Sequence, residues 1–172
     1  MRRGYIQVYT GNGKGKTTAA LGLALRAAGA GLKVFIMQFI KKRRCSEHKM
    51  LERFRGLITL RQYGRGFILK REANRSDIRE AEAGLEEVRE AIASGNYDVV
   101  ILDEANVAVN CGLIGLDDLL GLMAAKPKKI ELVITGRYAH KKVVQMADLV
   151  TEMKEIRHYR EKGVMARSGI EY

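Results

Sequence analysis

A glycine-rich loop near the start of the chain constrains the fold more than any other segment. The loop spans residues 10–18 and reads TGNGKGKTT. Residues 5–9 before it are rich in β-branched and aromatic types, and residues 18–28 after it are rich in Ala and Leu. In a strand, loop and helix of this kind, backbone N–H groups and the helix N-terminus surround a phosphate group. The loop therefore predicts a nucleoside triphosphate site in an α/β protein.

Two side chains of this loop carry charge and ligand chemistry. Lys16 can place its ammonium on phosphate oxygens, and Thr17 can offer its hydroxyl to Mg²⁺. Thr10 stands where the general pattern G-x-x-x-x-G-K-[ST] has its first glycine, but Gly11 and Gly13 supply the backbone freedom of a tight turn. We predict that the following residues bind the nucleotide: Gly11, Asn12, Gly13, Lys14, Gly15, Lys16, Thr17 and Thr18.

The composition of the 172-residue chain is that of a globular protein, with 47% hydrophobic and 30% charged residues. Its length suits one domain, residues 1–172. No apolar run approaches the roughly 20 residues of a membrane helix, and no hydrophobic region follows the basic start. We therefore expect a cytoplasmic protein with no membrane partner. Cys45 and Cys111 lack metal-ligand spacing and are expected to be reduced thiols.

The formal net charge of +11 raises the question of a nucleic-acid partner. Most basic residues are scattered, apart from runs at residues 41–44, 126–129 and 157–162. Solvated loops and the steering of anionic small molecules account for the excess charge. We therefore expect no nucleic-acid partner.

Strand-like and helix-like runs alternate along the rest of the chain. Further strands are expected at residues 33–39, 57–60, 97–104, 130–135 and 148–153. Further helices are expected at residues 48–54, 76–93, 116–125 and 141–146. This alternation predicts an α/β fold with a mostly parallel β-sheet covered by helices on both faces.

Two acidic residues, Asp103 and Glu104, end a strand that is otherwise almost entirely apolar. The carboxyl ends of parallel strands form one edge of the sheet, beside the phosphate loop. Because Mg²⁺ prefers oxygen ligands, we predict a metal site formed by Thr17, Asp103 and Glu104, and the choice of direct ligand between the two acids stays open. Arg137 follows the next strand, where it can either reach a phosphate or pair with a neighbouring acid.

The segment at residues 65–71 places Phe67, Ile68 and Leu69 in an otherwise polar region. Bulky apolar residues in a loop indicate either a cofactor or partner surface or local filling of the core, and the residues alone favour the second slightly. The three histidines, His48, His140 and His158, show no ligand spacing and are expected on the surface or in supporting positions. No Ser-His-Asp or Cys-His arrangement can be recognised, so a substrate is expected to bring the nucleophile of any reaction.

Three segments together resemble the ATP:corrinoid adenosyltransferases of the cobalamin pathway. They are TGNGKGKTT at residues 10–18, ILDEAN at residues 101–106, and residues 133–172, which contain the family's TGR, ADLVTEM and GIEY segments in order. The resemblance covers essentially the whole chain and implies a P-loop (RecA-like) fold. It also implies that a Co(I) corrinoid attacks the 5′ carbon of ATP and that triphosphate leaves.

The resemblance also assigns roles to individual residues. Residues 11–17 would cradle the triphosphate with its tail in the loop, Lys16 would neutralise it, and Arg137 would contact it. Thr17 and Glu104, supported by Asp103, would hold Mg²⁺. Further implied partners are an electron donor such as a flavodoxin or reduced flavin, and a second copy of the chain in a homodimer.

Phe67 matches the family's aromatic residue beneath the corrin, where bulky side chains displace the lower axial ligand and ease reduction to Co(I). Leu69 stands where well-known members have a tryptophan, so the wedge differs in detail here. Some relatives have an N-terminal extension that helps close a neighbouring subunit's site; this sequence enters its first strand almost at once, so we expect that lid to be missing or supplied otherwise. The catalytic residues implied are Lys16, Phe67, Leu69 and Arg137.

Three other functions are compatible with the phosphate loop. A P-loop kinase or ATPase would transfer or hydrolyse the γ-phosphate and release ADP. A RecA-like ATPase would depend on nucleic acid, and a carrier would bind corrinoid or nucleotide without catalysis. The products formed from ATP distinguish these functions from adenosyl transfer.

Overall fold

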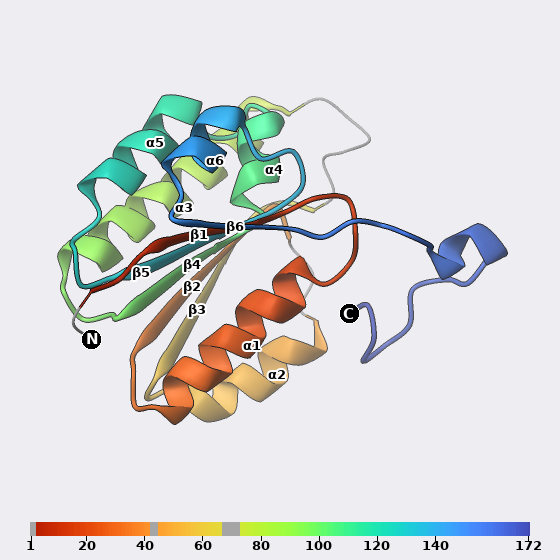
Figure 1. The fold of residues 1–172 in the computed structure, drawn as a ribbon, viewed down its shortest axis with the longest axis horizontal. Helices are drawn as coiled ribbons and strands as arrows, with labels where there is room; N and C mark the ends of the chain where they lie inside the picture. Colours follow the sequence, from red (N-terminus) through yellow and green to blue (C-terminus); the bar gives the residue numbers. More distant parts are fainter. Residues whose placement is uncertain (1–2, 42–44, 67–72) are drawn as a thin grey trace.

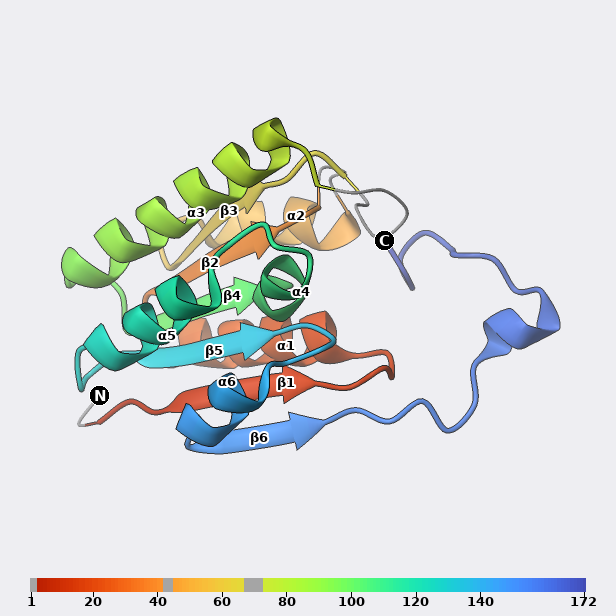
Figure 2. The same ribbon diagram turned by 90° about the horizontal axis from the view of Figure 1, so that it is seen from above.

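A single six-stranded β-sheet organises the computed structural model, which describes residues 3–41, 45–66 and 73–172. The strand order is β3-β2-β4-β5-β1-β6, and each described pair of neighbours is parallel (Figure 2). The strands are β1 (Ile6–Thr10), β2 (Val34–Phe39), β3 (Ile58–Tyr63), β4 (Val99–Asp103), β5 (Glu131–Thr135) and β6 (Leu149–Glu152). The expectation of an α/β protein with a mostly parallel sheet is confirmed.

Helices cover both faces of the sheet (Figure 1). One face carries α1 (Lys16–Gly29) and α2 (Ser46–Leu51), which continues into the 3-10 turn η1 (Glu52–Phe54). The other face carries α3 (Arg75–Ala93), α4 (Ala105–Asn110), α5 (Leu116–Ala125) and α6 (Lys141–Met146). None of these described helices has the length and apolar character that crossing a membrane requires.

The central strands are buried on both faces, which explains their almost continuous apolar sequence. In β2, Val34 and Ile36 join the core beneath α1, whereas Phe35, Met37 and Phe39 join the core beneath α3 and α5. Strand β6 differs, because all four of its residues are exposed at the edge of the sheet.

After β6 the chain runs outward beyond the sheet, forms the 3-10 turn η2 (Tyr159–Lys162) and then turns back (Figure 1). We call residues 153–172 the C-terminal segment. Its last residue returns to the start of α2, where Ser46 Oγ donates a hydrogen bond of 3.0 Å to the backbone oxygen of Tyr172. The chain end therefore lies close to the loop between β1 and α1.

Candidate active site

The phosphate loop joins the end of β1 to the start of α1, as the sequence predicts. Gly15 precedes α1 with a φ of +115°, and no side chain caps the first turn of the helix. Gly13 N–H donates to Met153 O at 2.7 Å, and a Cβ at Gly11 would lie 2.5 Å from the same oxygen. The two glycines therefore let the loop pack against the residue that follows β6. Because no side chain caps α1, the N–H groups of its first turn are open to an anion.

Lys16 is held by carbonyls of its own loop. Its Nζ donates to Gly11 O at 2.7 Å and to Gly13 O at 2.6 Å, and the residue is buried. Burial and then the positive charge of Arg137 lower the pKa of Lys16, while Glu104 and Asp103 act in the opposite direction. Phosphate oxygens entering the loop would be stronger partners for this ammonium than the two carbonyls.

Asp103, at the end of β4, is the centre of a buried hydrogen-bond network. Its Oδ1 accepts from Thr17 Oγ1 at 2.9 Å and from Thr135 Oγ1 at 2.7 Å. Its Oδ2 accepts from Lys41 Nζ at 2.8 Å and from Gln38 Nε2 at 3.1 Å. One carboxylate, only 1% exposed, thus joins α1, β5, β2 and the loop after β2.

Lys41 supplies the positive charge of this network. Burial disfavours its charged form, but the charge and hydrogen bond of Asp103 outweigh burial and raise the pKa of Lys41. Its Nζ also lies 3.3 Å from Thr17 Oγ1. In the sequence, Lys41 stands at the start of a basic run, and this pattern predicts no role for it in the site.

Glu104 adopts an unusual backbone conformation directly after Asp103. Its φ is +62°, and its N–H donates to Thr135 Oγ1 at 3.1 Å. Burial and then the charge of Asp103 raise the pKa of the Glu104 carboxyl group, against the charges of Lys41, Lys16 and Arg137. Its carboxylate is therefore an acidic group that a cation in the same cavity would stabilise.

One cavity of about 740 Å³ lies at the carboxyl ends of the strands, and the buried Asp103 lies behind its lining rather than in it. The phosphate loop, the first turns of α1, the start of α2 and the C-terminal segment form its walls. Lys16, Thr17, Glu104 and Arg137 all contribute to its lining. The structure thus brings the predicted phosphate-binding and metal-binding residues together at one site.

The C-terminal segment closes one side of this cavity. Lys14 Nζ donates to Tyr159 Oη at 2.8 Å and to Glu171 Oε1 at 2.7 Å. Glu171 also accepts from the backbone N–H of Arg167 at 2.7 Å and from the hydroxyl of Tyr159. The hydrogen bonds from Lys14 and Tyr159 hold the pKa of Glu171 far below its usual range. The sequence predicts that Lys14 binds the nucleotide. In this structure, its side chain is instead oriented toward the C-terminal segment.

His48 is connected to Asp103 through Gln38. The amide of Gln38 donates to Asp103, so its Oε1 faces His48 Nε2 at 2.9 Å. The Nδ1 atom accepts from Cys45 N–H at 2.9 Å, which requires the proton of the neutral ring to be on Nε2. His48 is 2% exposed, so it occupies a supporting position and not the surface.

The same histidine belongs to a cluster that the sequence spacing did not indicate. One ligand atom each from Cys45, Glu47 and His48 lies within 4.8 Å of the others. Both ring nitrogens of His48 already take part in hydrogen bonds, so metal binding there would break the link to Gln38 or the start of α2. We therefore assign no metal to this cluster.

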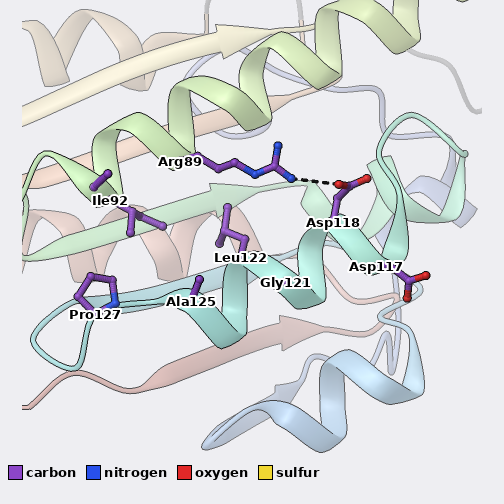
Figure 3. Close-up of a pocket in the computed structure, with 9 residues that line it drawn as sticks. Arg89, Ile92, Asp117, Asp118, Gly121, Leu122, Ala125 and Pro127 are labelled. Carbon is purple, nitrogen blue, oxygen red and sulfur yellow. Dashed lines mark hydrogen bonds and ion pairs between the residues drawn. The ribbon is translucent and has the colours of Figure 1, made fainter.

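A second cavity, of about 490 Å³, lies between α3 and α5 (Figure 3). An ion pair of 3.0 Å between Arg89 and Asp118 crosses it, and Ile92 and Leu122 supply apolar walls. The phosphate loop and the acids that end β4 do not line it. The nucleotide chemistry therefore belongs to the cavity at the strand ends.

Two of the predicted catalytic residues, Phe67 and Leu69, lie outside the described residues. Their proposed place beneath a corrin therefore stays a prediction.

Comparison with known proteins identifies relatives over almost the whole chain. The sequence profile of the family described as ATP:corrinoid adenosyltransferase BtuR/CobO/CobP matches residues 2–172. The corrinoid adenosyltransferase of Pseudomonas aeruginosa is 36% identical over 171 residues, which cover 99% of this chain and 84% of the relative. The corrinoid adenosyltransferase of Escherichia coli K12 and the corrinoid adenosyltransferase CobA of Salmonella typhimurium are each 34% identical over 170 residues, covering 99% of this chain and 86% of each relative. With a profile match over essentially its full length and a phosphate loop facing the acids of β4, the chain belongs to the ATP:corrinoid adenosyltransferase family.

Proposed function

We propose that the protein transfers the 5′-deoxyadenosyl group of ATP to the Co(I) ion of a corrinoid, with release of triphosphate, in adenosylcobalamin biosynthesis or salvage. The corrinoid is cobalamin, cobinamide or cobyrinic acid a,c-diamide. The observation that carries this proposal is the phosphate loop at one wall of a 740 Å³ cavity, in a chain of this family. The cavity leaves room beside the loop for the rest of the nucleotide.

In this reaction the protein orients two substrates and stabilises a leaving group. The cobalt electron pair forms the bond to the 5′ carbon, and the bond from that carbon to the α-phosphate oxygen breaks. The electrons of the broken bond stay on triphosphate, so its negative charge increases. Lys16, the N-terminus of α1 and Arg137 line the cavity that would hold this triphosphate. The main contribution of these residues to catalysis is positive charge that stabilises the leaving triphosphate.

The residues around Asp103 fit a magnesium ion. They offer hydroxyl and carboxylate oxygens from Thr17, Asp103 and Glu104, which are the ligand types that Mg²⁺ prefers. A positive group, the Lys41 ammonium, lies beside the Thr17 hydroxyl and the Asp103 carboxylate, which supports a cation position there. Bound Mg²⁺ would supply charge neutralisation to the triphosphate. We propose Thr17 and Glu104 as its ligands, with Asp103 in support.

Family membership supports proposals for the remaining partners. We propose that an electron donor such as a flavodoxin or reduced flavin delivers the electron that forms Co(I). We also propose a homodimer that acts in the cytoplasm.

Product analysis tests the proposed function. The protein is incubated anaerobically with MgATP and chemically reduced corrinoid, and the cobalt spectrum and the phosphate products are followed. The expected result is a light-sensitive adenosyl-corrinoid with an equal amount of triphosphate. ADP without alkylated cobalt would instead indicate a kinase or ATPase. ATP turnover that requires added DNA or RNA would indicate a nucleic-acid-dependent ATPase, and binding without product would indicate a carrier.

Phe67→Ala is expected to slow adenosyl transfer more when a reductase must first reduce Co(II) than when the corrinoid is supplied as Co(I). If Phe67 displaces the lower axial ligand, its removal makes reduction of Co(II) harder but leaves attack by Co(I) on ATP largely intact. The rate should fall at least about tenfold further with a reductase and Co(II) than with pre-reduced Co(I), a difference of roughly 1.4 kcal/mol in barrier. Ile68→Ala is the control for general disturbance of the segment. Equal losses in the two assays would contradict the wedge role.

A further inference from the structure

The cation position beside Asp103 is filled by a side chain of the protein itself. Lys41 Nζ lies 2.8 Å from Asp103 Oδ2 and 3.3 Å from Thr17 Oγ1. These oxygens belong to the hydroxyl and the carboxylate that the proposed function places around Mg²⁺. An ammonium group therefore occupies the space between a proposed ligand and its supporting acid.

The burial of Asp103 explains why a charge is needed there. The carboxylate is 1% exposed, and a buried carboxylate without a positive partner is costly. Thr17, Thr135 and Gln38 donate hydrogen bonds to it but carry no charge. The nearby ammonium of Lys16 is bound to the carbonyls of Gly11 and Gly13. Among the described residues, Lys41 is thus the cation that pairs directly with Asp103, at 2.8 Å.

Lys41 and Mg²⁺ compete for the same hydroxyl group. Mg²⁺ binds oxygen at about 2.0–2.1 Å, so an ion on Thr17 Oγ1 beside the Asp103 carboxylate would crowd the ammonium, which lies 3.3 Å from that oxygen. Two cations at such a separation also repel strongly in a partly buried site. Binding of the metal therefore requires Lys41 to leave.

The cavity offers the Lys41 side chain a second position. Its side chain is 27% exposed, and it lines the same cavity as Lys16 and Arg137. A triphosphate in this cavity would offer new anionic oxygens within the range of a flexible four-carbon chain. Without a triphosphate, the displaced ammonium would lose its 2.8 Å ion pair with Asp103 and would meet no phosphate oxygens in exchange.

We propose that Lys41 is a built-in metal surrogate, which pairs with Asp103 and Thr17 in the nucleotide-free protein and moves to the triphosphate when Mg²⁺ arrives with ATP. This proposal rests on the proposed function, because it takes the metal to be the one that accompanies ATP. The free protein then excludes divalent ions, and metal and triphosphate bind in a coupled manner. Lys41 acts as a positioning residue in the free protein and as a phosphate ligand in the complex.

Binding of Mn²⁺, which reports on magnesium sites by electron paramagnetic resonance, tests the surrogate without any corrinoid. In nucleotide-free protein, Lys41→Met should bind Mn²⁺ at least about tenfold more tightly than the wild type, because the competing ammonium is gone. Lys49→Met removes one positive charge from an exposed position of α2 and is the matched control. Its Mn²⁺ affinity should stay within about twofold of the wild type, since exposed charges interact weakly at a distance.

A second measurement follows the coupling between metal and nucleotide. The measured quantity is the ratio of the ATP dissociation constants without and with saturating Mg²⁺. This ratio should be at least about threefold smaller in Lys41→Met than in the wild type, because the variant has no ammonium that can move to the triphosphate. Lys41→Gln, which keeps a hydrogen-bond donor, provides a second neutral variant if Lys41→Met is poorly folded. An unchanged or weaker Mn²⁺ affinity in a folded neutral variant would overturn the surrogate.

The outcome is separable from that of the proposed function. If Lys41→Met binds Mn²⁺ more tightly as expected but the protein releases ADP from ATP, the role of Lys41 is supported and the proposed adenosyl transfer is rejected. If the wild-type protein performs adenosyl transfer but Lys41→Met leaves the Mn²⁺ affinity unchanged, the proposed function is supported and the role of Lys41 as a metal surrogate is rejected. Failure of every variant to bind Mn²⁺, with or without ATP, would overturn the surrogate together with the metal site.

Discussion

Replacing Lys16 with alanine is expected to abolish adenosyl transfer, with kcat/KM reduced at least about 10³-fold. The ammonium lies at the base of the loop, 2.7 Å from Gly11 O and 2.6 Å from Gly13 O. It is buried, so little water remains to replace it once the triphosphate is bound. Removing a buried charge that faces a departing polyanion raises the barrier of the chemical step. The measurement is the anaerobic assay with pre-reduced Co(I) corrinoid.

Lys14→Ala provides the matched control within the same loop. It removes the same charge two residues earlier, but the Lys14 ammonium is oriented toward Tyr159 and Glu171. Its loss should therefore lower kcat/KM by less than about tenfold, mainly by loosening the C-terminal segment. Equal losses in the two variants would mean that the loop contributes only general positive charge. Circular dichroism of both variants checks that the loss is not one of folding.

The layered α/β fold could be predicted because its strands are buried on both faces. Strands β2 and β4 are almost continuous apolar runs, and such runs between amphipathic helices identify a parallel sheet. Helix α4 was not predicted. It has only six residues and starts directly after Glu104, whose φ of +62° and lack of a side-chain cap give no usual start signal. Its position depends on tertiary packing against β2 and β5.

The phosphate loop and the acid pair were predicted because local patterns encode them. Lys16 and Thr17 occupy motif positions, and Asp103 follows a buried strand, so the parallel sheet brings them to one edge. The partners of Asp103 were harder to find. Gln38 is the one polar residue of β2, which was a usable signal, but Lys41 lay hidden in a basic run. Their contact with Asp103 depends on β2 lying beside β4, which the order of strands along the chain does not reveal.

The contacts of the C-terminal segment depend on residues still farther apart. Lys14 and Glu171 are separated by 157 positions, and neither lies in a periodic pattern that indicates a partner. The family resemblance identified the segment as family-like but gave no contact for it. Long-range ion pairs between loops carry no local sequence signal, so only the folded chain reveals this wall of the cavity.

Replacing Asp103 with asparagine is expected to remove activity and to destabilise the protein by about 2–4 kcal/mol. The carboxylate accepts hydrogen bonds from Thr17, Thr135, Lys41 and Gln38, and all four are donors. An asparagine amide offers one acceptor atom and one NH₂ group, so two of these donors would face another donor. Lys41 would also lose the charged partner that lies 2.8 Å from its Nζ. Urea denaturation of the variant and the wild type measures the stability difference.

The double variant Asp103→Asn with Lys41→Met separates the charge pair from the rest of the network. Removing the unpaired ammonium should recover about 1–2 kcal/mol of the lost stability, because residues in direct contact are not additive. Activity should stay lost, since the proposed metal ligands Thr17 and Glu104 would lack the supporting carboxylate of Asp103. If the two substitutions instead add in their effects on stability, Lys41 would not depend on Asp103 as the 2.8 Å contact indicates. Recovery of activity along with stability would show that Asp103 serves only to hold Lys41, and the metal site would then depend on Glu104 and Thr17 alone.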